Sequence, residues 1–154
     1  STLFPYTTLF RSIEDIIKEI GTYQRKSQYI HDITTFLVDN HLDTIPNDRK
    51  LLESLKGVGR KTANVFLSIV YHDPTIAVDT HVTRVSKRLN LAREKDDVKT
   101  IEKKLTKLVP KDRRGKTHHQ LVLFGRYYCK AIKPLCNNCN LKNICKYYKE
   151  TNIN

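Results

Sequence analysis

The chain has 154 residues, of which 39% are hydrophobic, so it is long enough for one domain or two small domains with an apolar core. Lysine and arginine outnumber the acidic residues by 28 to 16, which gives a net charge of +12 and indicates a polyanionic partner. No apolar run reaches the roughly 20 residues of a membrane-spanning helix, so the composition excludes a membrane-spanning protein and favours nucleic acid as the partner.

The first twelve residues show neither helical periodicity nor the alternation of a strand. Residues 2–12 instead resemble the in-frame translation of a common high-throughput sequencing adapter. We therefore interpret residues 1–12 as a non-native segment and exclude them from the fold prediction. On this interpretation the native sequence starts near Ile13, already inside a domain.

Apolar residues spaced three or four apart run through the chain after this segment, which is typical of amphipathic helices. The spacing predicts a short helix from Ile13 to Ile20, ended by Gly21, and a longer helix over residues 23–40. A turn around Ile45–Asp48 is expected to start the next helix, which leads into a pair of glycines.

The second half of the chain continues the helical pattern. A helix is expected to stop before Asp73-Pro74, another to start at the N-cap Asp79, and two more to cover residues 98–108 and 117–130. Strand signals are weak throughout. We therefore predict an all-α fold, with helical domains at residues 13–92 and 93–154, the second ending in short turns organised by cysteines.

Two glycines separate consecutive predicted helices in the segment Leu55–Ala63, which reads LKGVGRKTA. Glycine permits φ > 0 and keeps side chains away from an approaching phosphate, and the N–H groups at the following helix start favour an anion. An ordinary helical corner would also use such glycines, but the flanking cations favour a DNA-binding helix–hairpin–helix. The residues expected to contact DNA here are Lys56, Gly57, Val58, Gly59 and Arg60.

Lys61 lies in the first turn of the helix that follows this hairpin. A lysine at this place can bind phosphate, which composition alone favours, or it can act as an amine nucleophile. The positive helix end and Arg60 both favour the neutral amine that a nucleophile needs. Asp79 is the obvious partner, because a carboxylate held at an N-cap can stabilise a developing sugar cation.

The four cysteines, Cys129, Cys136, Cys139 and Cys145, form a C-x6-C-x2-C-x5-C pattern near the C-terminus. Such a local cluster indicates a metal site rather than the dispersed disulfides of a small secreted domain. Four thiolates suit tetrahedral zinc, whereas the irregular spacing also fits a [4Fe–4S] cluster. The spacing alone leaves both metals open.

Five motifs occur together in this chain, namely Leu55–Ala63, Val78–His81, His118-His119, Gly125–Tyr127 and the cysteine pattern. Over about residues 13–148 this combination resembles the endonuclease III family, which are helix–hairpin–helix DNA glycosylases. The resemblance implies that Lys61 is the catalytic lysine, that Asp79 is the catalytic aspartate and that the cysteines hold a [4Fe–4S] cluster. It also implies that the loop at residues 130–135 presents Lys130 and Lys133 to DNA.

The resemblance further implies base excision by a bifunctional DNA glycosylase and AP lyase. A damaged pyrimidine leaves the duplex, the amine of Lys61 displaces the base, and the resulting Schiff base nicks the strand by β-elimination. The expected partner is double-stranded DNA with oxidised pyrimidines or abasic sites. The expected protein is a monomer of the bacterial cytoplasm, associated with the nucleoid.

Three alternatives accompany this hypothesis. They are a non-catalytic helix–hairpin–helix module that binds DNA, a zinc-stabilised interaction domain, and a mismatch adenine glycosylase, although members of the last group usually lack a lysine at the position of Lys61. Family members also carry an N-terminal region before the equivalent of Ile13. We therefore expect the glycosylase fold to be incomplete at its N-terminus.

Overall fold

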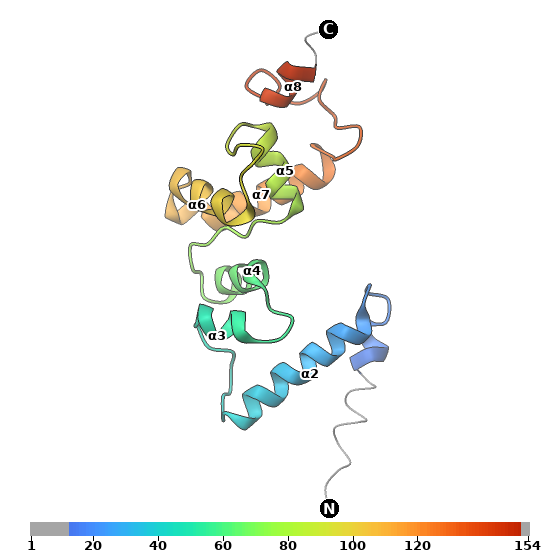
Figure 1. Ribbon diagram of the computed structural model, residues 1–154, viewed down its shortest axis with the longest axis vertical. Helices are drawn as coiled ribbons and strands as arrows, with labels where there is room; N and C mark the ends of the chain where they lie inside the picture. The colour runs from blue at the N-terminus through green and yellow to red at the C-terminus, as the bar shows by residue number, and fades with distance from the viewer. Residues whose placement is uncertain (1–12, 152–154) are drawn as a thin grey trace, which may run out of the picture. The chain divides into compact units, whose positions relative to one another are not determined.

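The computed structural model describes residues 13–151, which are helical and contain no strand, as predicted (Figure 1). The chain divides into two compact units between Gly59 and Arg60. The predicted non-native segment lies outside the described residues, and the domain division predicted after residue 92 stays a prediction. No helix within residues 13–151 combines the length and apolar character needed to span a bilayer.

The described part of the first unit contains a short helical stretch at residues 13–17 and the helices α2 (Tyr23–Asp39) and α3 (Arg49–Ser54). The helix predicted before them is shorter than expected: residues 13–17 are helical, and the chain then turns with the N–H of Ile20 bonded to the carbonyl of Ile17. Helix α3 begins where the turn was expected, because the carboxylate of Asp48 accepts bonds from the first free N–H groups of the helix.

The second unit contains the remaining helices and the cysteines. Its elements are α4 (Arg60–Val70), α5 (Thr80–Arg88), α6 (Val98–Leu108), a 3₁₀ turn (Lys111–Arg113), α7 (Arg114–Tyr127) and α8 (Lys146–Thr151). Asp97 caps α6 through a bond from the N–H of Thr100 at 2.8 Å. Buried apolar side chains of α5, α6, the segment before α5 and the connection between these helices form the core, namely Ile76, Val78, Val82, Ala92, Ile101 and Leu105.

Helix α7 differs from its prediction at both ends, since it was expected over residues 117–130. Arg114 fixes the earlier start by donating to three main-chain carbonyls, those of Pro74, Thr106 and Val109. The helix closes before the first cysteine, where the N–H of Cys129 bonds back five residues to the carbonyl of Phe124. Helix α8 replaces the last of the turns expected in the tail.

Candidate functional site

Lys61 is the second residue of α4, and its side chain is exposed to solvent. The opposite side of the same helix is buried at Ala63 and Leu67, whose exposed fractions are 0% and 1%. The buried side of the helix therefore fixes the backbone of Lys61, while the amine stays accessible to a ligand.

Asp79 is the N-cap of α5, as the sequence predicted. One of its carboxylate oxygens accepts a bond from the N–H of Val82 at 2.8 Å. The three residues before it, Ile76 to Val78, are buried in the core. Because both the backbone and the side chain are held, the carboxylate has a fixed position at the start of α5.

His118 contacts the segment that leads to Asp79. Its Nδ1 lies 2.8 Å from the carbonyl oxygen of Ala77, two residues before Asp79, so the ring holds the segment that carries the carboxylate. Burial lowers the pKa of His118, and both Asp79 and Lys61 are close enough to act on the ring electrostatically. Its motif was noticed in the sequence, but no role was predicted for His118, since no local pattern places a residue of α7 beside Ala77.

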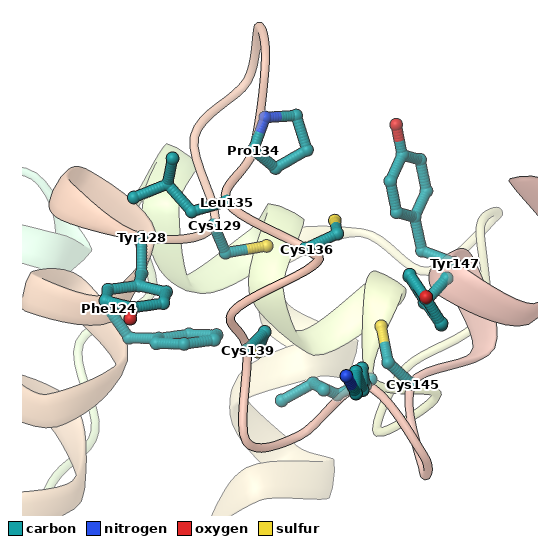
Figure 2. Close-up of a pocket in the computed structure, with 12 residues that line it drawn as sticks. Phe124, Tyr128, Cys129, Pro134, Leu135, Cys136, Cys139, Cys145 and Tyr147 are labelled. Carbon is teal, nitrogen blue, oxygen red and sulfur yellow. The ribbon is translucent and has the colours of Figure 1, made fainter.

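The four cysteines line one pocket, together with aromatic side chains of α7 and α8 (Figure 2). Figure 2 shows the sulfur atoms of Cys129 and Cys145 directed into this space from two sides. Burial and the neighbouring thiols raise the pKa of Cys136. Among residues 13–151, no three His, Cys, Asp or Glu side chains are close enough together to hold a metal ion.

N–H groups point at two of these sulfur atoms. The guanidinium of Arg88 lies 3.3 Å from the Sγ of Cys129, and the N–H of Leu141 lies 3.4 Å from the Sγ of Cys139. Such donors stabilise sulfur that carries negative charge, as a metal-bound thiolate does. The donor set therefore fits a metal cluster with thiolate ligands.

Two arginines of α5 hold the chain around the first cysteine. Arg84 donates to the main-chain carbonyls of Cys129 and Gly125, at 3.0 and 2.6 Å. Arg88 donates to the carbonyls of Lys130 and Ala131, and its guanidinium stacks 4.1 Å above the ring of Tyr147.

The loop at residues 130–135 exposes both cations that were predicted to contact DNA. Lys130 and Lys133 are exposed, and Lys133 has a φ of 49° directly before a proline. Because Arg88 of α5 bonds to the carbonyl of Lys130, the start of this loop after α7 is fixed beside α5 while its lysines face solvent.

The glycine hairpin ends the first unit. Gly57 has a φ of 81°, and a Cβ built on it would lie 2.2 Å from the ring of Tyr29, so this position requires glycine. Lys56 forms an ion pair with Asp32 at 3.2 Å, yet its side chain is 76% exposed. Val58 is half-buried and Gly59 exposed. Lys56 and Gly59 are therefore accessible to a ligand, as a DNA contact requires.

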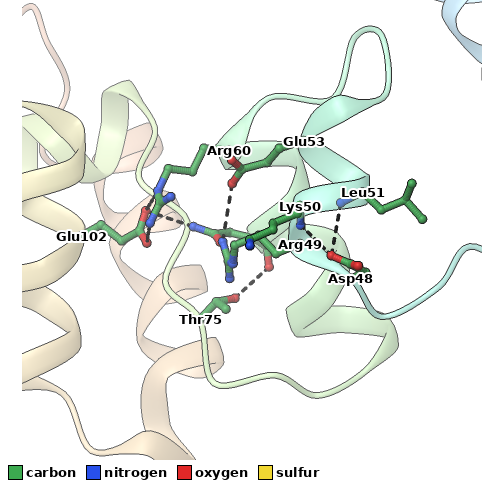
Figure 3. A network of polar contacts seen from close by, with 9 residues as sticks. Asp48, Arg49, Lys50, Leu51, Glu53, Arg60, Thr75 and Glu102 are labelled. Carbon is green, nitrogen blue, oxygen red and sulfur yellow. Dashed lines mark hydrogen bonds and ion pairs between the residues drawn. The ribbon is translucent and has the colours of Figure 1, made fainter.

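Arg60 was predicted to contact DNA, but its guanidinium is paired within the protein. Its guanidinium donates two hydrogen bonds to the carboxylate of Glu102, from Nε at 2.9 Å and from Nη2 at 2.8 Å (Figure 3). The sequence prediction assigned this charge to DNA, whereas in the structure it pairs with a carboxylate of α6. Local sequence could not reveal the partner, because the two residues are 42 positions apart.

Comparison with known proteins identifies the family. Residues 7–111 match the HhH-GPD superfamily of base excision DNA repair proteins. Endonuclease III of Haemophilus influenzae is 43% identical over 153 residues, and that of Bacillus subtilis is 46% identical over 134 residues. This chain belongs to the endonuclease III family. The superfamily match begins inside the predicted non-native segment, whose origin stays a prediction.

Solved structures agree with this assignment to the endonuclease III family. A trapped endonuclease III–DNA covalent intermediate, in an estranged-adenine complex, is 44% identical and superposes with a TM-score of 0.87 over 95% of this chain. A non-covalent endonuclease III–DNA complex gives the same values. A thermostable thymine-DNA glycosylase, at 23% identity and a TM-score of 0.81, shares the fold. The predicted glycosylase fold is confirmed.

The chain is shorter than these relatives. It spans 61% of the length of the B. subtilis protein, 72% of the H. influenzae protein and 66% of endonuclease III of Escherichia coli. The two endonuclease III structures in complex with DNA are covered to 69%.

Proposed function

We propose that this chain is a DNA glycosylase with AP lyase activity, which removes oxidised pyrimidines and nicks abasic sites in base excision repair. The observation that carries this proposal is the placement of Lys61 and Asp79 in one compact unit, the amine exposed and the carboxylate fixed, both within electrostatic range of His118. The similarity to an endonuclease III trapped covalently on DNA supports it.

The proposed reaction starts with a damaged pyrimidine rotated out of the duplex. The neutral amine of Lys61 attacks C1′ of the sugar; the Nζ–C1′ bond forms as the bond from C1′ to the base breaks, and the base leaves with its electron pair and takes up a proton. The sugar ring then opens to give a Schiff base. Removal of a C2′ proton expels the 3′ phosphate and nicks the strand.

Asp79 is proposed to stabilise the positive charge that develops on the sugar. Because its carboxylate is already bonded to the N–H of Val82, the charge needs little reorganisation during the reaction. The same carboxylate also attracts the protonated form of Lys61. The balance between these two effects is tested by the rate of Asp79→Asn, which we expect to be lower than that of the wild type.

The covalent step can be tested by borohydride trapping on DNA that contains an abasic site. We expect a covalent adduct with the wild-type chain and none with Lys61→Ala, because the Schiff base needs this amine. Lys107→Ala, which changes an exposed lysine in the last turn of α6, should trap as the wild type does. Full-strength trapping by Lys61→Ala would show that another residue is the nucleophile.

We further propose that Cys129, Cys136, Cys139 and Cys145 hold a [4Fe–4S] cluster. The irregular C-x6-C-x2-C-x5-C spacing suits such a cluster. N–H donors point at two of the sulfurs, as thiolate ligands favour, and the similarity to endonuclease III supports a cluster rather than a zinc ion. Through such a cluster, the four cysteines would join the end of α7, the loop and the start of α8, with no part in base removal.

The cluster proposal is tested by metal analysis of the purified chain. We expect four iron atoms per chain, as the [4Fe–4S] formula requires, and a broad visible absorption band that disappears on oxidation. A colourless protein with one zinc ion per chain would contradict the cluster and support a zinc site.

The proposed DNA contacts are the glycine hairpin with Lys56, and the loop with Lys130 and Lys133. All three lysines are exposed, and neither residues 55–63 nor residues 130–135 contain an acidic residue. Contacts of this kind bind phosphates, so affinity for DNA should fall as salt rises. Binding that does not change with salt would argue against these contacts.

A further inference from the structure

Glu102 is the acceptor of an unusually complete set of hydrogen bonds. Two come from Arg60, and a third comes from the side-chain amide of Asn64 at 3.1 Å (Figure 3). The side chain of Glu102 is only 14% exposed, and Asn64 is 1% exposed. The carboxylate is therefore largely removed from water and depends on these donors for its stability.

The network reaches the chain on both sides of the candidate site. Arg60 directly precedes Lys61, and Asn64 lies one turn further along α4. The main-chain carbonyl of Asn64 accepts a bond from the hydroxyl of Thr75 at 2.8 Å, and Thr75 belongs to the segment that leads to Asp79. One connected set of bonds thus joins α6, the first turn of α4 and the segment before α5.

We propose that Glu102 is a positioning residue for Lys61. By holding Arg60 and Asn64, it fixes the first turn of α4 on α6, so that the amine of Lys61 keeps a constant position relative to Asp79. This inference rests on the proposed function, since it concerns the same amine. A long lysine side chain has four rotatable bonds, and a fixed backbone is what limits its reach.

The same geometry assigns Arg60 to Glu102 rather than to a DNA phosphate. A bidentate pair between a guanidinium and a carboxylate is strong because both hydrogen bonds are charge-assisted. If Arg60 turned to DNA, Glu102 would keep only the bond from Asn64, and a largely buried carboxylate would lose its counter-charge. Arg60 therefore acts through Lys61 and makes no direct contact with the strand.

The test measures rate and affinity separately for Arg60→Ala and Glu102→Gln. The trapping rate on abasic-site DNA, at saturating protein, should fall roughly 10- to 100-fold in both variants, as expected for a misplaced reacting group. The Kd for the same DNA, measured in the Lys61→Ala background, should stay within about twofold, which is less than 0.5 kcal/mol. Circular dichroism at the assay temperature checks that each variant is folded.

Two further variants separate positioning from a general loss of stability. Lys104→Ala removes another ion pair of α6, that with Asp96, and should change neither rate nor affinity. Arg60→Glu combined with Glu102→Arg restores the pair in reverse, and the amide of Asn64 can turn to present its oxygen. The double variant should regain part of the trapping rate that each single variant loses.

The opposite pattern would overturn the inference. If Arg60→Ala weakens DNA binding while Glu102→Gln strengthens it and keeps the wild-type trapping rate, Arg60 binds phosphate and Glu102 only competes with DNA. Equal trapping rates in all variants would also refute the positioning role. Absence of trapping by the wild-type chain would instead refute the proposed function. The Kd values of Arg60→Ala and Glu102→Gln for DNA would still show whether Arg60 pairs with Glu102 or with a phosphate.

Discussion

The helices α4 to α7 and the cysteine loop, residues 129–145, belong to one compact unit but are held by different interactions. Helices α5 to α7 share a core in which Ile76, Val82 and Ile101 are completely buried, and α4 buries Ala63 and Leu67. In the cysteine loop, Ile132 and Ile144 are 80% and 69% exposed, and Cys145 is its one buried residue in the part of the chain that the structure describes. Apolar burial holds the first region, whereas arginine contacts hold the second.

This difference predicts separate responses to damage. Asp79 follows directly on residues of the apolar core, and α4 is held by its buried Ala63 and Leu67 and by the bonds of Asn64 to Glu102 and Thr75. None of these contacts involves the loop, so both helices should keep their structure when the loop is disturbed. The loop buries too little apolar surface to offset the entropy of ordering it, so it should depend on metal and on Arg84 and Arg88. The following changes test this separation, from the largest expected effect to the smallest.

Cys136→Ser should have the largest effect. Removing one of the four thiols should abolish nearly all iron binding, and the loop should then become sensitive to protease, because its remaining contacts do not replace the metal. Circular dichroism should show that most of the helical signal persists. Asn137→Ser, an exposed change in the same loop, is the matched control and should keep its iron. Complete unfolding of Cys136→Ser would show that the two regions are not separate.

Arg88→Ala should have the next largest effect. The change removes three hydrogen bonds and the stacking on Tyr147, which together are worth about 2–4 kcal/mol. Hydrogen exchange should rise at residues 130–135 and stay unchanged in α4. Arg93→Ala, which changes an exposed arginine of the same unit, should alter neither. Faster exchange in α4 would mean that the loop also supports the helices.

Gly125→Ala tests the packing of the helices, with the cysteine loop left unchanged. A Cβ at this position would lie 2.9 Å from the Cβ of His81 and 3.2 Å from a methyl carbon of Val85, where α7 packs closely on α5. The expected cost is about 1–3 kcal/mol, measured as a lower Tm. Gly59→Ala, which meets nothing within 4 Å, should leave the Tm unchanged. An unchanged Tm in Gly125→Ala would show that the helices can separate without cost.

The smallest expected effect is a pH dependence. Burial lowers the pKa of His118 below its ordinary value of 6.5, the bond to Ala77 opposes this shift, and His119, Asp79 and Lys61 also act on the ring. The unfolded chain therefore binds more protons than the folded chain just below pH 6.5. The contribution of His118 to the free energy of unfolding is fully present above this pH, and it is lost as the pH falls towards the lower pKa of His118 in the folded state.

His118→Asn should flatten this dependence, because the amide keeps a donor for the carbonyl of Ala77 but does not titrate. The measurement is the Tm between pH 5 and 8, a range about the ordinary pKa of histidine. His119→Asn, which changes the exposed neighbour, should keep the slope of the wild type. An unchanged slope in His118→Asn would assign the pH dependence to another group.

Local sequence signals predicted the elements but not the contacts between them. The N-cap at Asp79 and the glycine at position 57 follow from backbone requirements that a few neighbouring residues express. The partners of Arg60 and Arg88 lie about 40 residues away and carry no local pattern. Helix α8 was missed because six residues are too few to show a helical period.

Lys133 places a cation at a position whose backbone conformation disfavours lysine. Its φ of 49° suits glycine or asparagine, and it precedes Pro134, which restricts its backbone further. Replacing it with glycine would relax the backbone by about 1 kcal/mol but would remove an exposed cation from the loop. If this loop contacts DNA as we propose, engineering it for thermal stability would work against that contact, and the two properties should be selected together.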